Sequence, residues 1–127
     1  MTPAQQEMFD AALAAHTNAH APYSRYPVGA SVRSESGRVY AGCNVENAAY
    51  GVTLCAECSM IGELFATGGG KLHAFYCVDA SGTALMPCGR CRQLLSEHRG
   101  ENMILMTPRG IMSMDQVLPD AFGPHNL

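Results

Sequence analysis

Two Cys-x-x-Cys pairs constrain this chain more than any other feature of its sequence. Cys55 and Cys58 form the first pair, and Cys88 and Cys91 form the second. The apolar spacing after the first pair and the proline before the second indicate that each pair opens a helix. Helix N-termini favour thiolates, the form of cysteine that binds metal ions, because their N–H groups lack partners and their dipole is positive there. The two pairs therefore predict a metal site between two helix N-termini.

The number of cysteines that bind this metal is left open by the spacing. Sulfur ligands select zinc over magnesium or calcium. Four cysteines would make a closed structural site, but 29 residues lie between Cys58 and Cys88, whereas paired Cys-x-x-Cys ribbons usually have about 15 to 20. This disfavours a structural zinc module. Cys55 and Cys58 nevertheless lie three residues apart on one helix face, from which both thiols can reach one ion.

Glu57 distinguishes two kinds of zinc site. A closed structural site has no use for a carboxylate two residues after Cys55, whereas a hydrolytic site needs one to take a proton from water. The pattern Cys-x-Glu followed by a distant Pro-Cys-x-x-Cys is typical of zinc deaminases that act on nucleobases and use three cysteines. The sequence thus predicts a zinc hydrolase in which Glu57 transfers protons.

The length, charge and apolar content of the chain indicate which kinds of partner it can have. A chain of 127 residues fits one domain, residues 1–127, with one core. Its 8 basic and 11 acidic residues are scattered and give a net charge of −3, which argues against a nucleic acid partner. No stretch approaches the roughly 20 apolar residues of a membrane span, and no signal-peptide pattern is present. We therefore expect a cytoplasmic protein without a membrane partner, whose cysteines bind metal or lie buried.

Capping and periodicity predict the secondary structure. Thr2 as N-cap, Pro3 at the first helical position and Gln5 as capping-box partner start a helix that stops before Pro22. A hairpin around "ESG" covers about residues 28 to 45. A helix follows each Cys-x-x-Cys pair, and the second of these helices is expected to end at the glycine of "EHRG".

The remaining segments complete a sheet. The apolar run "KLHAFYCVDA" predicts a central buried strand, and "ENMILMT" and "IMSM" predict a second hairpin, followed by a short helical turn. Cys43 and Cys77 lie in strand patterns and are expected in the core, as are the methionines of the second hairpin. The order of elements predicts an α/β fold with one five-stranded mixed sheet and helices on both faces.

Four stretches carry a resemblance to a known family: "YSRYPVGA", "GCNVENAAYGVTLCAE", "MPCGRCRQLL" and "LPDAFG". In this order and spacing the chain resembles the small homotetrameric cytidine deaminases that act on free nucleosides. The resemblance implies a three-layer α/β/α cytidine-deaminase-like fold with one zinc ion per subunit. It also implies hydrolytic deamination of cytidine and 2′-deoxycytidine to the uridine forms, with release of ammonia, in pyrimidine salvage.

The resemblance assigns roles at the metal site. It implies that Cys55, Cys88 and Cys91 bind zinc and that Glu57 is the proton shuttle. Cys58 departs from the family, which commonly has an arginine there that offsets the charge of the thiolates. A charge compensator is then needed elsewhere, and our hypothesis is that Arg90 supplies it; a solvated helix charge is the alternative.

The resemblance also assigns a substrate pocket. It implies that Asn44 and Glu46 bind a ribose hydroxyl and that Tyr26, where the family usually has phenylalanine, stacks on the pyrimidine. Val28 and Ala56 belong to the same set as apolar neighbours of the substrate.

Two more aromatic residues are implied to act between subunits. Tyr50 and Phe122 match residues that enter the pocket from neighbouring subunits, so the active site would be complete only in the homotetramer. The substrate that the resemblance implies is a small nucleoside.

Two other functions stay open. A deaminase of a modified pyrimidine nucleoside, such as a nucleoside antibiotic, shares "CAE" and "PCGxCRQ" with this chain. A four-cysteine zinc interaction module is the alternative outside enzymes, and it predicts four sulfur ligands and no turnover.

Overall fold

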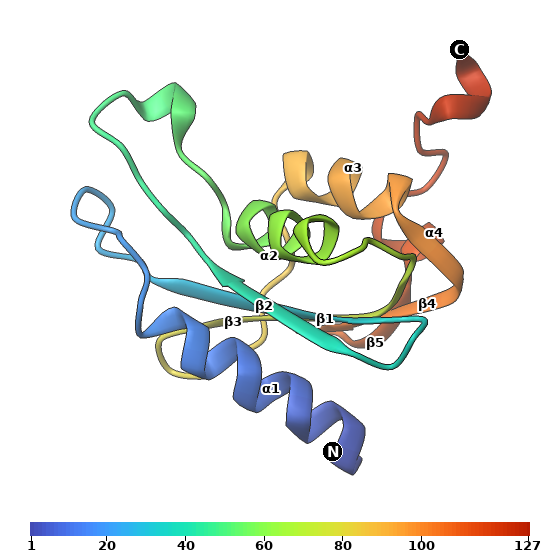
Figure 1. The fold of residues 1–127 in the computed structure, drawn as a ribbon, viewed down its shortest axis with the longest axis horizontal. Coiled ribbons are helices and arrows are strands. Elements are labelled where there is room, and N and C mark those ends of the chain that lie inside the picture. Colours follow the sequence, from blue (N-terminus) through green and yellow to red (C-terminus); the bar gives the residue numbers. More distant parts are fainter.

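A five-stranded mixed sheet forms the centre of the molecule, and the computed structural model describes all of residues 1–127 (Figure 1). The strands lie in the order β2-β1-β3-β4-β5, so β3 is central as predicted. β3 runs parallel to β4, and the other neighbouring strands are antiparallel. The strands are β1 (Val28–Ser34), β2 (Val39–Cys43), β3 (Leu72–Asp79), β4 (Arg99–Thr107) and β5 (Gly110–Ser113).

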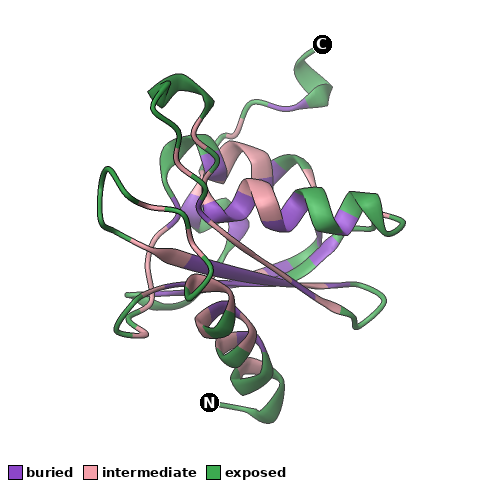
Figure 2. Ribbon diagram, turned by 60° about the vertical axis from the view of Figure 1, so that its left-hand side comes forward, coloured by how far each residue is buried: buried purple, intermediate pink, exposed green.

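Helices cover both faces of this sheet. α1 (Pro3–His16) packs on one face, and α2 (Ala56–Ala66) and α3 (Gly89–Glu97) lie side by side on the other (Figure 1). Figure 2 shows that buried residues line the sides of the helices and strands that face one another. The buried apolar residues form two clusters, a larger one under α2 and α3 and a smaller one under α1. The predicted three-layer α/β/α arrangement is confirmed.

The N-terminal cap forms as the sequence predicts. The Thr2 hydroxyl accepts a hydrogen bond from the Gln5 backbone amide, and the Gln5 side chain accepts one from the Thr2 amide. α1 ends at His16, six residues before Pro22. None of the helices in the structure has the length and apolarity needed to cross a bilayer.

The ends of two elements differ from the sequence prediction. α3 ends at Glu97, and Gly100 lies inside β4 instead of ending the helix. Strand pairing explains the difference: a Cβ atom on Gly100 would lie 2.8 Å from the Leu72 carbonyl oxygen of β3, so glycine permits the close approach there. Met114, expected in the last strand, instead begins the short helix α4 (Met114–Val117), which Ser113 caps.

The two Cys-x-x-Cys segments open helices as predicted. Cys55 is the N-cap residue of α2, and Cys88 is the N-cap residue of α3. Both helices lie on the same face of the sheet (Figure 1). This packing brings their N-termini together.

Candidate active site

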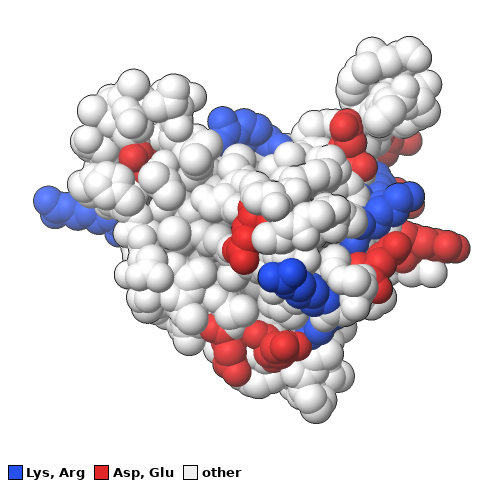
Figure 3. Space-filling model, viewed as in Figure 1, with Lys and Arg blue, Asp and Glu red and all other residues white.

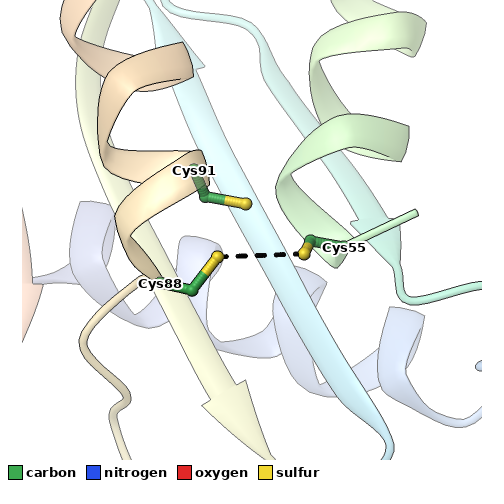
Figure 4. A group of neighbouring side chains, drawn as sticks. All are labelled: Cys55, Cys88 and Cys91. Atoms are coloured by element: carbon green, nitrogen blue, oxygen red, sulfur yellow. Dashed lines mark hydrogen bonds between the residues drawn. The ribbon is translucent and has the colours of Figure 1, made fainter. Parts of the chain in front are cut away.

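Three cysteine sulfur atoms converge where α2 and α3 begin. The Sγ atoms of Cys55, Cys88 and Cys91 all lie within 4.8 Å of one another. Figure 4 shows the three side chains pointing toward a common centre, with 3.9 Å between the sulfurs of Cys55 and Cys88. Cys58 lies outside this group. The fold therefore assembles three thiols, one from α2 and two from α3.

The surroundings of these thiols suit a metal cation. Burial raises the pKa of Cys55 and of Cys91. Burial also opposes ionisation of Cys88, but hydrogen bonds from the backbone and side chain of Cys91 outweigh it and lower the pKa of Cys88. Ionising all three groups requires a positive charge among them, and three converging sulfurs are the donor chemistry that zinc prefers. The residues present fit a zinc ion held by three protein ligands.

Glu57 lies beside the three thiols. It occupies the first turn of α2 and is 4% exposed. Its Oε1 atom accepts a hydrogen bond from the thiol of Cys77, at a sulfur-to-oxygen distance of 3.3 Å. Cys77 is buried in β3, as predicted, whereas Cys43 at the end of β2 is only partly buried. The carboxyl group of Glu57 is thus held between the thiol cluster and the central strand.

A cavity of about 230 Å³ connects these groups with the solvent. Glu57, Cys55 and Cys88 line it, together with Val28 and Ala56, which the sequence also placed near the substrate. Sequence reasoning missed several other lining residues. These are Thr53, Cys77, Leu85, Met86 and Pro87. Their only sequence signal is position: each precedes a cysteine of the metal site or lies on the predicted central strand.

The amide of Asn44 forms part of the cavity wall. Its Oδ1 atom accepts a hydrogen bond from the Val28 backbone amide at 2.9 Å, and its Nδ2 atom donates one to the Tyr26 carbonyl at 2.9 Å. Asn44 is 9% exposed. It therefore fixes the backbone that leads into β1 at the edge of the cavity.

Glu46 faces a second cavity of about 290 Å³. Its carboxylate accepts hydrogen bonds from the Tyr23 and Ser24 backbone amides and from the Ser24 hydroxyl. The bonds from Ser24 lower the pKa of Glu46. Thr53 lines both cavities, so they adjoin. Asn44 and Glu46 thus face neighbouring hollows of one surface.

Three aromatic residues of the predicted pocket lie outside the cavity at the cysteines. Tyr26 is 49% exposed, Phe122 is 59% exposed, and Tyr50, in the short 3₁₀ turn η1 (Tyr50–Val52), is 74% exposed. Tyr50 lines the second cavity and contacts the ring of Tyr23 edge to face, with 5.9 Å between ring centres. Phe122 belongs to the C-terminal tail, whose last residues extend away from the sheet (Figure 1), and its backbone carbonyl accepts a hydrogen bond from Gln93 of α3 at 2.8 Å.

The sequence model of a known family, described as the cytidine and deoxycytidylate deaminase zinc-binding region, matches residues 2–107 of this chain. The match includes all three cysteines of the cluster and Glu57. The chain belongs to this deaminase family.

Similar proteins support the assignment to the deaminase family. A cytidine deaminase of Mycobacterium tuberculosis is 51% identical over 116 residues, which cover 91% of this chain and 87% of that protein. The crystal structure of a cytidine deaminase from Mycobacterium leprae is 56% identical, with a TM-score of 0.88, and covers 91% of this chain and 98% of that chain. That of a cytidine deaminase from Mycobacterium tuberculosis has a TM-score of 0.89 at 49% identity, covering 94% of this chain and 97% of that one. The predicted family and fold are confirmed.

Proposed function

We propose that this deaminase hydrolyses free cytidine and 2′-deoxycytidine to uridine and 2′-deoxyuridine with release of ammonia, in pyrimidine salvage. One observation carries the proposal: three sulfurs converge without a fourth, and the buried carboxyl group of Glu57 lines one cavity together with two of these cysteines, Cys55 and Cys88. An ion held in this way would keep a free position for water, and Glu57, which lines the same cavity as Cys55 and Cys88, would exchange protons with that water.

Cys55, Cys88 and Cys91 would hold the zinc ion. Zinc at a site with three protein ligands supplies Lewis acidity and lowers the pKa of a coordinated water. Glu57 takes a proton from the attacking water and delivers it to N3 of the pyrimidine as the C4–O bond forms. Glu57 then takes the second proton of the water from the new hydroxyl group at C4 and transfers it to the amino nitrogen, the C4–N bond breaks, and ammonia leaves. The oxygen of the water remains at C4 as the carbonyl of the uracil product.

The adjoining cavities suggest how a nucleoside is oriented. Val28, Ala56 and the methylene groups of the loop before α3 give the first cavity an apolar wall for the pyrimidine. The ribose then extends toward the second cavity, where Glu46 offers a carboxylate to its hydroxyl groups. Asn44 lines the first cavity, and Thr53 lies where the two cavities meet. Binding of the sugar by Glu46 requires its hydrogen bonds with residues 23 and 24 to be shared or exchanged.

Homotetramer assembly is part of the proposal. Tyr26, Tyr50 and Phe122 expose large aromatic surfaces away from the cysteines of their own chain. Exposed aromatic side chains are typical of surfaces that bind another protein. We propose that Tyr50 and Phe122 complete the pockets of neighbouring subunits and that Tyr26 stacks on the pyrimidine once the assembly has formed.

We also propose that a long nucleic acid is not a substrate of this enzyme. Lysine and arginine side chains stay separated from one another on the face drawn in Figure 3, and acidic side chains lie between them. Binding a polynucleotide requires a continuous basic surface. We further propose that the enzyme acts in the cytoplasm, because thiols that bind metal need a reducing compartment.

The decisive experiment measures turnover and zinc content on the same preparation. Loss of cytidine absorbance in the ultraviolet, with one zinc ion per chain, is the expected result. Competition between cytidine and a modified pyrimidine nucleoside then tests the substrate, and preference for the modified nucleoside would contradict the proposal. A zinc-loaded protein that leaves cytidine, deoxycytidine and modified nucleosides unchanged would instead indicate an interaction module.

A further inference from the structure

The side chain of Arg90 crosses from one helix of the metal site to the other. Arg90 lies in the first turn of α3, between Cys88 and Cys91. Its Nη2 atom lies 3.7 Å from the sulfur of Cys55 and 3.8 Å from the sulfur of Cys58, both at the start of α2. The same atom donates a hydrogen bond to the Thr53 carbonyl at 3.1 Å. A guanidinium group from α3 thus contacts the ligand that α2 supplies.

We infer that Arg90 is a positioning residue for the metal centre, which holds the thiolate of Cys55 toward the ion and offsets its negative charge. This inference rests on the proposed zinc site. Three thiolates around a divalent cation carry a net charge of −1, and the carboxyl group of Glu57 lies beside them. A fixed positive charge within hydrogen-bonding distance of one thiolate lowers the free energy of this arrangement.

Arg90 is the arginine whose contacts are directed at the cluster. Arg92, its neighbour on α3, donates instead to the Pro87 carbonyl at 2.7 Å. Two further arginines form salt bridges: Arg33 binds Glu7, and Arg99 binds Asp115. Their partners lie on α1 and α4, outside the cavity at the cysteines. The compensating charge near the thiols therefore comes from Arg90.

Cys58 makes room for this contact. It lies one turn after Cys55 on α2, and its sulfur touches the same guanidinium nitrogen. At 3.8 Å the two atoms are in van der Waals contact, so a longer side chain at position 58 would displace the guanidinium group. The short side chain of Cys58 thus leaves room between α2 and α3 for the long side chain of Arg90.

The inference predicts weaker zinc binding when the charge is removed. Residues that contact metal ligands typically contribute about 10- to 100-fold to metal affinity. We expect the Arg90→Gln variant to bind zinc about 10- to 100-fold more weakly than the unaltered protein, measured by competition with a chromophoric chelator. Arg109→Gln is the control, because it removes the same charge in the turn between β4 and β5. It should leave the affinity unchanged. Equal affinities for Arg90→Gln and the unaltered protein would overturn the inference.

A second variant separates charge from loop anchoring, since Arg90 also binds the Thr53 carbonyl. Cys58→Arg in the Arg90→Gln background returns a cation to the thiols from α2 without restoring the bond to Thr53. We expect it to recover most of the lost zinc affinity. Failure to recover any affinity, in a variant whose circular dichroism matches the parent, would show that Arg90 only anchors the loop and would overturn the inference.

Zinc affinity is measured without substrate, so this test is independent of the substrate assignment. An unaltered protein that binds zinc but deaminates no cytidine would contradict the proposed function, while the comparison of Arg90 variants would still decide the role of Arg90.

Discussion

The thiol of Cys77 donates a hydrogen bond to Oε1 of Glu57 across 3.3 Å. Cys77 comes from the central strand β3, and Glu57 comes from the first turn of α2. Both side chains are buried, and both line the cavity that Cys55 and Cys88 also line. The central strand therefore does more than fill the core: it restrains the carboxyl group that the proposed reaction uses to move protons.

Removing this hydrogen bond is expected to slow turnover. A typical hydrogen bond contributes about 1 kcal/mol, so Cys77→Ala should lower kcat about fivefold while KM changes less. Cys77→Ser retains a donor and should stay closer to the unaltered protein. Steady-state kinetics on both variants provide the test. If Cys77→Ala keeps full kcat, the thiol does not position Glu57.

Gly42 on β2 allows α2 to pack closely against the sheet. A Cβ atom there would lie 2.4 Å from the Met60 amide nitrogen and 2.7 Å from the Ala56 carbonyl oxygen. Both are backbone atoms of α2, so the helix itself would have to move. Gly42→Ala should lower the free energy of unfolding by about 1 to 3 kcal/mol, measured by urea denaturation.

Gly62 is the matched control for this change. It lies in α2 and has open space where a Cβ atom would be added. Gly62→Ala should raise the free energy of unfolding by about 0.5 to 1 kcal/mol, because alanine has less backbone freedom to lose than glycine. Equal effects of the two substitutions would show that β2 and α2 are not in close contact.

Phe122 tests whether pockets are shared between subunits. The residue is 59% exposed and does not line the cavity at the cysteines of its own chain. Phe122→Ala should therefore retain zinc but lose turnover, and activity per chain should fall when the protein is diluted until it dissociates. Sedimentation and kinetics at matched concentrations provide the measurement. Fully active monomers would exclude shared pockets.

Glu57→Gln separates metal binding from proton transfer. Glutamine has a similar shape but cannot carry a proton between the water and the substrate. We expect the variant to keep its zinc and to lose about 10²- to 10⁴-fold in kcat. Zinc content and kinetics measured on one preparation check both parts. Appreciable residual turnover would remove Glu57 from the proposed chemistry.

Local sequence signals were sufficient for much of the fold. The capping box of Thr2 and Gln5 and the helix starts at Cys55 and Cys88 depend on neighbours within a few residues, and they form as predicted. The sequence predicts Gly100 at a helix end, because glycine commonly ends helices. Its place in β4 depends on pairing with β3, 28 positions earlier at Leu72, which local sequence does not report.

The contacts within the site depend on how separate elements pack. The strand pattern predicted that Cys77 is buried, but only the register of β3 against α2 places its thiol at Glu57. The reach of Arg90 to Cys55 likewise depends on the distance between α2 and α3. Asn44 and Glu46 lie two residues apart in the segment after β2, yet they line two different, adjoining cavities.

The central claim is that three sulfurs, and not four, hold the metal. Zinc content per chain, measured by atomic absorption after dialysis against a weak chelator, tests it when Cys58→Ser is compared with Cys55→Ser, Cys88→Ser and Cys91→Ser. We predict that Cys58→Ser keeps about one zinc ion per chain, since its sulfur lies outside the cluster of three, and that each of the other variants loses it. Loss of zinc from Cys58→Ser to the same extent as from the other three would contradict the account.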